Sequence, residues 1–261
     1  MNNTAVVYCT YPRSLNGGFH DNFLKYKNEN FENLFVVFDD QGKELDPTQI
    51  KSVYKNTPIF AYNLKDFDKY QFNRPIDKKH RWGSHQNPNY FYAHFRMLLF
   101  YMKYNQFDYY WFFDDDVYFD ANLKEFLTEY ESHKEDFMAI QVFQKENYPE
   151  FPKISKANDR MGSHGSWLGF APGPGDNYKS TKRHMGSFYP IVRYSNKAMK
   201  HLIDVHNEGF YGYSEGFVPT TLASDGFSVA SMLNEYDEYF INPKTVCKLA
   251  HKQDNFTWTW I

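Results

Sequence analysis

The chain has 261 residues, of which 42% are hydrophobic and 20% are aromatic. Disordered chains are poor in aromatic side chains, so this composition predicts a folded protein of one large domain or two small ones. The formal net charge of −3 argues against a nucleic-acid-binding protein, because such proteins usually carry a basic surplus. With only two cysteines, Cys9 and Cys247, the chain is neither a disulfide scaffold nor a cysteine-rich zinc module.

No stretch of the sequence reaches the roughly 20 consecutive apolar residues of a membrane-spanning helix. The N-terminus also lacks the basic start and apolar run of a secretory signal. We therefore expect a cytoplasmic protein without a transmembrane segment, with an excised lumenal domain of a longer chain as the alternative. The sequence gives no indication of the oligomeric state.

In the first half of the chain, short apolar runs at residues 5–9, 34–38 and 59–62 predict strands that are covered on both faces, as in a parallel sheet. The polar stretch between the first two runs fits a helix. Residues 89–104 predict another helix, because large apolar side chains recur at spacings of four, three and four. A further apolar strand at 109–113 follows it and ends in three aspartates.

In the second half, Asp120 is expected to cap a helix that carries Leu123 and Leu127, and a strand is expected at 138–143. Residues 144–185 are rich in glycine and proline and predict a long mobile loop. A strand at 188–192 and a helix capped by Ser195 come next. A helix at 217–223, with Pro219 in its first turn, and late strands at 239–241 and 246–250 complete an α/β pattern with a mainly parallel sheet flanked by helices.

The most informative motif is the trio Asp114, Asp115 and Asp116, directly after the apolar strand at 109–113. In open α/β sheets, ligands bind outside the carboxyl ends of the strands. Adjacent carboxylates repel one another, and a hard divalent cation such as Mn²⁺ or Mg²⁺ among them would relieve that repulsion. The trio therefore indicates a metal site, while a solvated acidic turn that caps the next helix is the plainer alternative.

On this motif and its place after a strand, the chain resembles the nucleotide-sugar-dependent glycosyltransferases of the GT-A fold, whose hallmark is an Asp-x-Asp motif. The resemblance implies a single GT-A-like (Rossmann-like) domain over 1–261. Residues 1–120 would bind the nucleotide sugar and residues 121–261 the acceptor. It implies that Asp116 is the direct ligand of Mn²⁺ or Mg²⁺, that Asp114 contacts the ribose or the metal, and that Asp115 takes either role. It also implies a histidine ligand late in the chain, and His251, directly after the strand expected at 246–250, fits that position.

Two carboxylates compete for the role of the general base that an inverting transferase needs for the acceptor hydroxyl. Glu215 lies just ahead of the expected helix at 217–223, where family members often place an acidic residue, and Asp225 is its rival. The alternative for Glu215 is a carboxylate that the helix dipole stabilises at the N-terminus of the helix, with no catalytic role. A retaining enzyme would need no such base.

Further candidates follow from their places in the chain. Tyr11, Arg13 and Asp39 follow strands and Arg96 lies on the helix before the aspartates, so each is placed to meet the nucleotide sugar. Surface salt bridges are the alternative for the two arginines. Trp167 in the long loop is the candidate for stacking on an acceptor sugar. His184 is the second candidate for binding the acceptor; its basic stretch could also neutralise a leaving diphosphate or be a solvated run of charges.

These features predict a metal-dependent glycosyltransferase that moves a sugar from a nucleotide diphosphate sugar, most simply a UDP-sugar, to a glycan or other hydroxyl acceptor. Two rivals remain open. One is a metal-dependent phosphotransferase or phosphohydrolase with Asp114 as nucleophile, and the other is a non-catalytic sugar-binding protein. Phosphate-binding loops, dinucleotide fingerprints and the serine-hydrolase motif are missing from the sequence, and Cys9 lacks the context of a nucleophile.

Overall fold

The structure is a computed structural model of the whole chain, and it describes residues 3–11, 18–40, 47–69, 93–115, 117, 122–144, 177–180 and 182–232. Within these ranges the strands are β1 (Thr4–Thr10), β2 (Leu34–Asp39), β3 (Ile59–Tyr62), β4 (Tyr109–Asp114), β5 (Phe137–Gln144), β6 (Met185–Ser195) and β7 (Val229–Ser231). The helices are α1 (Gly18–Asn28), α2 (Pro47–Val53), α3 (Leu64–Lys69), α5 (Ala93–Lys103), α6 (Leu123–Glu129), α8 (Asn196–Asn207) and α9 (Ser214–Ser224).

The strands form one seven-stranded sheet in the order β3-β2-β1-β4-β6-β5-β7. β6 runs antiparallel to both of its neighbours, β4 and β5, whereas the other neighbouring pairs are parallel. The predicted α/β fold with a mainly parallel sheet is therefore confirmed. Strands from the first and the second half of the chain share this sheet.

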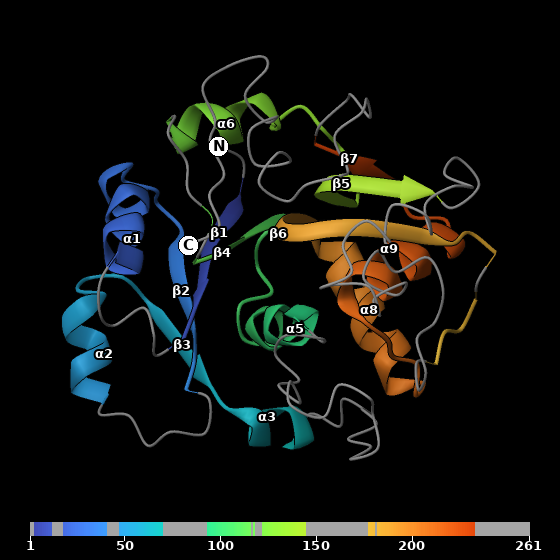
Figure 1. Cartoon of the computed structure of the whole chain (residues 1–261), viewed down its shortest axis with the longest axis horizontal. Helices are drawn as coiled ribbons and strands as arrows, with labels where there is room; N and C mark the ends of the chain where they lie inside the picture. The colour runs from blue at the N-terminus through green and yellow to red at the C-terminus, as the bar shows by residue number, and fades with distance from the viewer. Residues whose placement is uncertain are drawn as a thin grey trace, which may run out of the picture.

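Alternate residues of each central strand enter cores on opposite faces of the sheet, which explains why the strands are apolar without interruption. In β4, Tyr110 and Phe112 belong to one core, whereas Trp111 and Phe113 belong to the other. Helices α5, α8 and α9 contribute to the first core, and α1, α2 and α6 contribute to the second. Figure 1 shows α1 and α2 beside β1 and β2, with α5, α8 and α9 below the strands at the centre and right.

Capping explains where two of the helices begin. Ser195 accepts a hydrogen bond from the N–H of Ala198 at 3.2 Å, so its predicted role as the N-cap of α8 is confirmed. Gly209, with a φ of 94°, follows the end of α8 in the left-handed conformation that glycine adopts most easily. The helix predicted to carry Leu123 and Leu127 is confirmed as α6, but its predicted cap was wrong: Asn122 caps it, and its side chain accepts from the N–H of Glu125 at 3.1 Å. Asp120 lies outside the described residues.

Helix α9 differs most from its prediction. It begins at Ser214 rather than at 217, so Glu215 lies within its first turn and Pro219 in its interior. Proline has no N–H, so the carbonyl of Glu215, four residues earlier, loses its helical partner. Ser187 on β6 supplies a replacement, because its hydroxyl donates to that carbonyl at 3.0 Å. The expected strands at 239–241 and 246–250 lie outside the described residues, as does most of the loop at 144–185.

None of the helices in the described part of the chain has the length and apolar character that crossing a bilayer requires.

Candidate functional site

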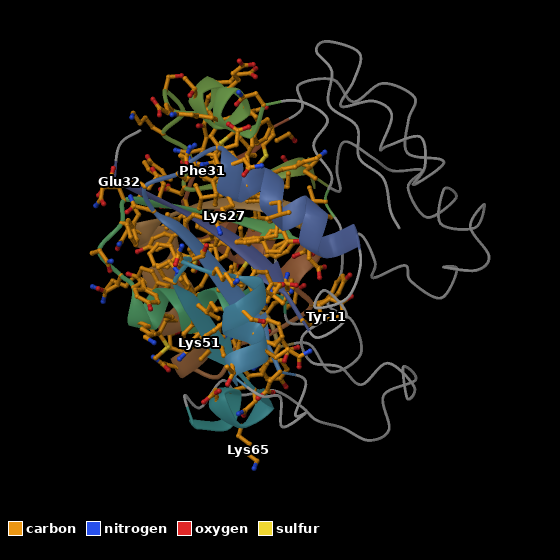
Figure 2. The ribbon with its side chains drawn as sticks, turned by 90° about the vertical axis from the view of Figure 1, so that its left-hand side faces the viewer. Tyr11, Lys27, Phe31, Glu32, Lys51 and Lys65 are labelled. Atoms are coloured by element: carbon orange, nitrogen blue, oxygen red, sulfur yellow. The ribbon has the colours of Figure 1, made fainter. Side chains whose placement is uncertain are left out.

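The carboxyl ends of β1, β2 and β4 lie at the same edge of the sheet, because the three strands are parallel. The register pairs Cys9 near the end of β1 with Asp114 at the end of β4, and Asp39 at the end of β2 with Tyr62 at the end of β3. Figure 2 shows Tyr11 at this edge and Phe31, which precedes β2, at the opposite edge. The fold thus brings to one edge candidates as distant in the sequence as Tyr11 and Asp114.

Asp114 forms an ion pair with Arg96 at this edge. Arg96 lies in the first turn of α5, and its guanidinium donates to Oδ1 of Asp114. The side chains of Arg96 and Asp114 are 11% and 31% exposed. Burial of the guanidinium lowers the pKa of Arg96, but the charges around it, Asp114 foremost, together raise that pKa above its ordinary value. Arg96 therefore keeps a full positive charge beside the carboxylate.

Asp115 points away from the solvent side of this edge. It is 2% exposed, and its Oδ2 accepts a hydrogen bond from the hydroxyl of Thr10 at 3.0 Å. The Tyr8 hydroxyl donates to the backbone carbonyl of Asp115 at 3.3 Å. Asp115 thus ties the end of β4 to the end of β1. Asp116, the predicted direct metal ligand, lies outside the described residues.

Glu215 approaches the same site from the second half of the chain. Its side chain is 8% exposed, and one carboxyl oxygen accepts from the hydroxyl of Tyr213 at 2.9 Å. Burial raises the pKa of Glu215 to about 8, and the negative charge of Asp114 adds to that rise, while hydrogen bonds from Tyr213 and from the backbone at Tyr189 oppose it. A carboxyl group with such a pKa exchanges its proton near neutral pH, as a general base or acid must.

Asp225, the rival of Glu215, lies at the opposite end of α9. Its Oδ2 is hydrogen-bonded to Nε2 of His201 at 2.8 Å. Glu215 and Asp225 are separated by ten positions in the sequence, which corresponds to about 15 Å along the helix axis at 1.5 Å per residue. The structure therefore groups Glu215, but not Asp225, with Asp114.

His184 directly precedes β6, in the part of the chain that extends beyond the end of β4. Ile191 pairs with Phe113, and the six residues from Ile191 back to Met185 extend about 20 Å along the strand. The Nε2 atom of His184 is buried and has no hydrogen-bond partner in the described part of the chain. The structure thus sets His184 well apart from Asp114.

The remaining candidates differ in what the structure says of them. Asp39 is 4% exposed, and its charge adds to the effect of burial in raising the pKa of Tyr62. Burial raises the pKa of the Cys9 thiol to about 12, so this thiol stays protonated at neutral pH and is no nucleophile. Arg13, Trp167 and His251 lie outside the described residues.

The described residues supply only part of what a divalent-cation site requires. Nowhere in the described ranges do three His, Cys, Asp or Glu side chains gather as a metal site requires. Asp114 offers the carboxylate oxygens that Mn²⁺ and Mg²⁺ prefer, but its partner Arg96 competes for them. Asp115 is engaged with Thr10 instead. The other two predicted ligands, Asp116 and His251, lie outside the described residues.

Sequence reasoning missed the residues that hold this edge in place. Thr10, Ser187 and Tyr213 each bond a predicted site residue, yet none lies in a recognisable motif. Thr10 could have been found, because it ends β1 at the ligand edge. Ser187 has no such signal, because its bond to the Glu215 carbonyl is set by how β6 packs against α9. Tyr213 lies only two residues before its partner Glu215, but no sequence pattern marks its hydroxyl for that bond.

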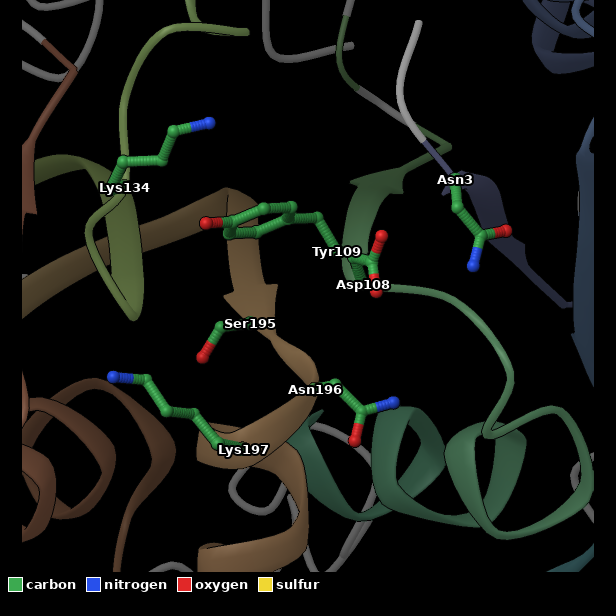
Figure 3. Close-up of a pocket in the computed structure, with 7 residues that line it drawn as sticks. All are labelled: Asn3, Asp108, Tyr109, Lys134, Ser195, Asn196 and Lys197. Carbon is green, nitrogen blue, oxygen red and sulfur yellow. The ribbon is translucent and has the colours of Figure 1, made fainter.

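A cavity of about 640 Å³ lies at the opposite edge of the sheet (Figure 3). Asp108 and Tyr109, where β4 begins, and Ser195, where β6 ends, line it together with Lys134 and Lys197. It is therefore separated from Asp114 by the length of β4.

Comparisons with known proteins find likeness in fold only. No protein-family model matches the chain, and no curated protein matches it in sequence. Apo xyloside xylosyltransferase 1 from mouse aligns at 11% identity over 87% of this chain and 84% of its own, with a TM-score of 0.47. Core-mannan synthase A from Aspergillus fumigatus, in a Mn/GDP form, aligns at 13% identity over 89% and 73%, with a TM-score of 0.44. A putative glucose-1-phosphate thymidylyltransferase from Bacillus anthracis aligns at 9% identity over 88% and 87%, with a TM-score of 0.46.

Proposed function

We propose that this protein is a metal-dependent glycosyltransferase that transfers a sugar from a nucleotide diphosphate sugar, a UDP-sugar in the simplest case, to the hydroxyl group of a glycan or similar acceptor. The observation that carries the proposal is the ion pair of Arg96 and Asp114 at the carboxyl edge of the sheet, with Glu215 near enough for the charge of Asp114 to raise its pKa. One half of the chain supplies charged groups suited to a diphosphate. The other half supplies a carboxyl group suited to proton transfer.

Asp114 and Asp116, with His251, would hold Mn²⁺ or Mg²⁺ in this proposal. Such a cation supplies Lewis-acid stabilisation of the charge that develops on the departing diphosphate. Arg96 supports the same purpose, because its buried positive charge lies beside Asp114 and favours a bound anion. Asp39 at the end of β2 and Tyr11 directly after β1 would contact the nucleoside.

Glu215 would take the proton of the acceptor hydroxyl. As the acceptor oxygen forms its bond to the anomeric carbon, the bond from that carbon to the diphosphate oxygen breaks, and the proton passes to the Glu215 carboxylate. The raised pKa of Glu215 makes it a stronger base than an exposed glutamate. Asp225 is less suited to this role, since it is hydrogen-bonded to His201 at the far end of α9.

The alternatives make different demands on the same residues. A phosphotransferase would use Asp114 as a nucleophile, but its Oδ1 is engaged by Arg96. Burying an ionisable carboxyl group costs folding free energy. A sugar-binding protein without activity would gain nothing from a buried carboxyl group whose pKa lies near 8, whereas an enzyme can use it for proton transfer.

The test is a panel of nucleotide sugars offered with Mn²⁺ or Mg²⁺, with release of the nucleoside diphosphate followed over time. We expect release from at least one donor, its loss on chelation, and a much slower reaction in Glu215→Gln. The matched control is Glu129→Gln, a change in an exposed glutamate of α6. Hydrolysis of a simple aryl phosphate without donor turnover would favour the phosphohydrolase instead. Donor binding without any turnover would favour the sugar-binding protein.

A further inference from the structure

A buried chain of hydrogen bonds joins α5, α8 and α9 beside the site. Nδ1 of His94 lies 2.7 Å from the hydroxyl oxygen of Ser214, and Nε2 of His94 lies 3.0 Å from Nε2 of His206. Nδ1 of His206 lies 2.7 Å from the carbonyl oxygen of Phe210. Both imidazoles are 0% exposed. Three helices and the segment before α9 are therefore linked through two side chains.

The two ends of this hydrogen-bond chain, the Phe210 carbonyl and the Ser214 hydroxyl, determine where each proton lies. The carbonyl of Phe210 can only accept, so Nδ1 of His206 carries a proton. In a neutral ring, Nε2 of His206 then accepts from the Nε2–H of His94. Nδ1 of His94 is left to accept from the Ser214 hydroxyl, whose oxygen accepts in turn from the backbone N–H of His94 at 3.2 Å. One arrangement of protons satisfies the whole chain.

The surroundings of the two rings favour their neutral forms. Burial lowers the pKa of both imidazoles, and the charge of a protonated His206 would lower that of His94 further. The pKa of His206 falls to about 4, although its hydrogen bond to the Phe210 carbonyl opposes that fall. The Phe217 ring from α9 is stacked against both imidazoles, and the Phe95 ring from α5 meets both edge-on. The charged residues nearest to these groups in the sequence are Arg96 on α5, Asp204 on α8, Glu208 directly after α8, and Glu215 on α9.

We propose that His94, His206 and Ser214 are positioning residues, which fix the first turn of α9 and thereby hold Glu215 at the site. Ser214 is the first residue of α9, and Glu215 is the second. The Tyr213 side chain, which precedes them, bonds the Glu215 carboxyl but does not cap the helix, so the link from Ser214 to His94 provides a second anchor for this turn. The kinetic part of this inference rests on the proposed function, whereas its proton arrangement and its effect on Glu215 do not.

The segment that leads into α9 is packed too tightly to shift by itself. A Cβ at Gly212 would lie 2.3 Å from Cε1 of Tyr178 and 3.0 Å from Cβ of Phe217. Tyr211 is held in place as well, because its N–H and carbonyl bond the backbone of Asn177 at 2.8 Å. With the backbone held up to Gly212, the link between His94 and Ser214 sets how the next turn begins.

The first measurement is nitrogen NMR of the histidine side chains in the wild-type protein at pH 7. We expect neutral rings, with the proton of His206 on Nδ1 and that of His94 on Nε2. The signals are assigned from His94→Gln and His206→Gln. A protonated ring, or the opposite proton positions in either residue, overturns the proposed chain. This measurement needs no donor, acceptor or metal.

The second measurement compares Ser214→Ala with Thr220→Val in metal-free protein. Thr220 is also buried on α9 and bonds the backbone of Met185, but it lies more than one turn beyond Glu215. In Ser214→Ala, we expect the titration of the Glu215 carboxyl, followed by carbon NMR, to fall by about one pH unit as water reaches it. In Thr220→Val, the titration should stay where it is in the wild-type protein.

The kinetic counterpart uses any donor that the panel identifies. Ser214→Ala should lower kcat about tenfold while the donor KM stays within about twofold, because a displaced base slows the chemical step and not donor binding. An unchanged Glu215 titration in Ser214→Ala, or equal shifts in both variants, overturns the inference. If no protein turns over a donor, the proposed function fails, yet the two NMR readouts still decide this inference.

Discussion

Replacing the buried Glu215 by glutamine should stabilise the protein at neutral pH while it slows transfer. Burial raises the pKa of this carboxyl group from 4.5 to about 8, so keeping it ionised in the folded chain is unfavourable. Glutamine resembles the protonated acid in shape and has no charge to bury. Its amide oxygen can still accept from the Tyr213 hydroxyl, which lies 2.9 Å from the native carboxyl oxygen.

The size of the effect follows from the two pKa values. The folded protein holds the Glu215 proton that the unfolded chain releases above pH 4.5, so the stability due to that proton is fully present below pH 4.5. It is lost as the pH rises and stops falling above about 8, where both states are ionised. At pH 7 the loss amounts to about 3 kcal/mol, at about 1.4 kcal/mol for each unit of pKa difference passed.

Urea denaturation of both proteins at several pH values between 4.5 and 8 measures this difference. The variant should match the wild-type protein near pH 4.5 and exceed it by about 3 kcal/mol at pH 7. The comparison cancels the other titrating groups, which the two proteins share. Glu129→Gln, in an exposed position, should show no such trend. A stability difference that stays constant with pH would refute the reasoning, because Glu215 would then ionise as freely in the folded chain as in the unfolded one.

Three further predictions concern the same edge of the sheet. Transfer should speed up as the pH rises toward about 8, because Glu215 accepts a proton only when ionised, and a rate that is flat with pH would exclude it as the base. Asp225→Asn should keep at least about half of the turnover measured in a steady-state assay, since that carboxylate pairs with His201 away from Asp114; a loss as large as that of Glu215→Gln would contradict this assignment. Asp115→Ala should lower the free energy of unfolding by about 1–3 kcal/mol in a urea titration, because Thr10 loses its buried acceptor, and an unchanged midpoint would show that the bond contributes nothing.

Much of the sheet could be predicted from the sequence, because a strand covered on both faces is apolar at every position. The run at 109–113 became β4 with one added residue, and the run at 59–62 matched β3 in full. β7 was missed, since its three residues are too few to form a pattern. The antiparallel direction of β6 was also missed, because direction depends on the path of the chain between strands.

Site residues could be predicted only where they directly follow a strand that the sequence makes recognisable. The aspartates had to lie at the ligand edge once β4 was recognised, but the sequence does not say which way each side chain turns. Asp114 faces Arg96 and Asp115 faces Thr10, and both partners come from other elements. The start of α9 was misplaced because Pro219 is typical of a first turn; Ser187, distant in the sequence, makes its interior position tolerable.

Calorimetric titration of the protein with UDP, in the presence and absence of Mn²⁺, tests most directly whether the aspartates bind a cation together with a diphosphate. The wild-type protein should bind UDP with Mn²⁺ and bind it much more weakly without the metal. Asp116→Asn should lose the effect of Mn²⁺ while it stays folded. Asp108→Asn, a change at the other end of β4, should behave as the wild-type protein does. If UDP binds Asp116→Asn as tightly as the wild-type protein, with the same dependence on Mn²⁺, these aspartates do not hold the metal and the account is wrong.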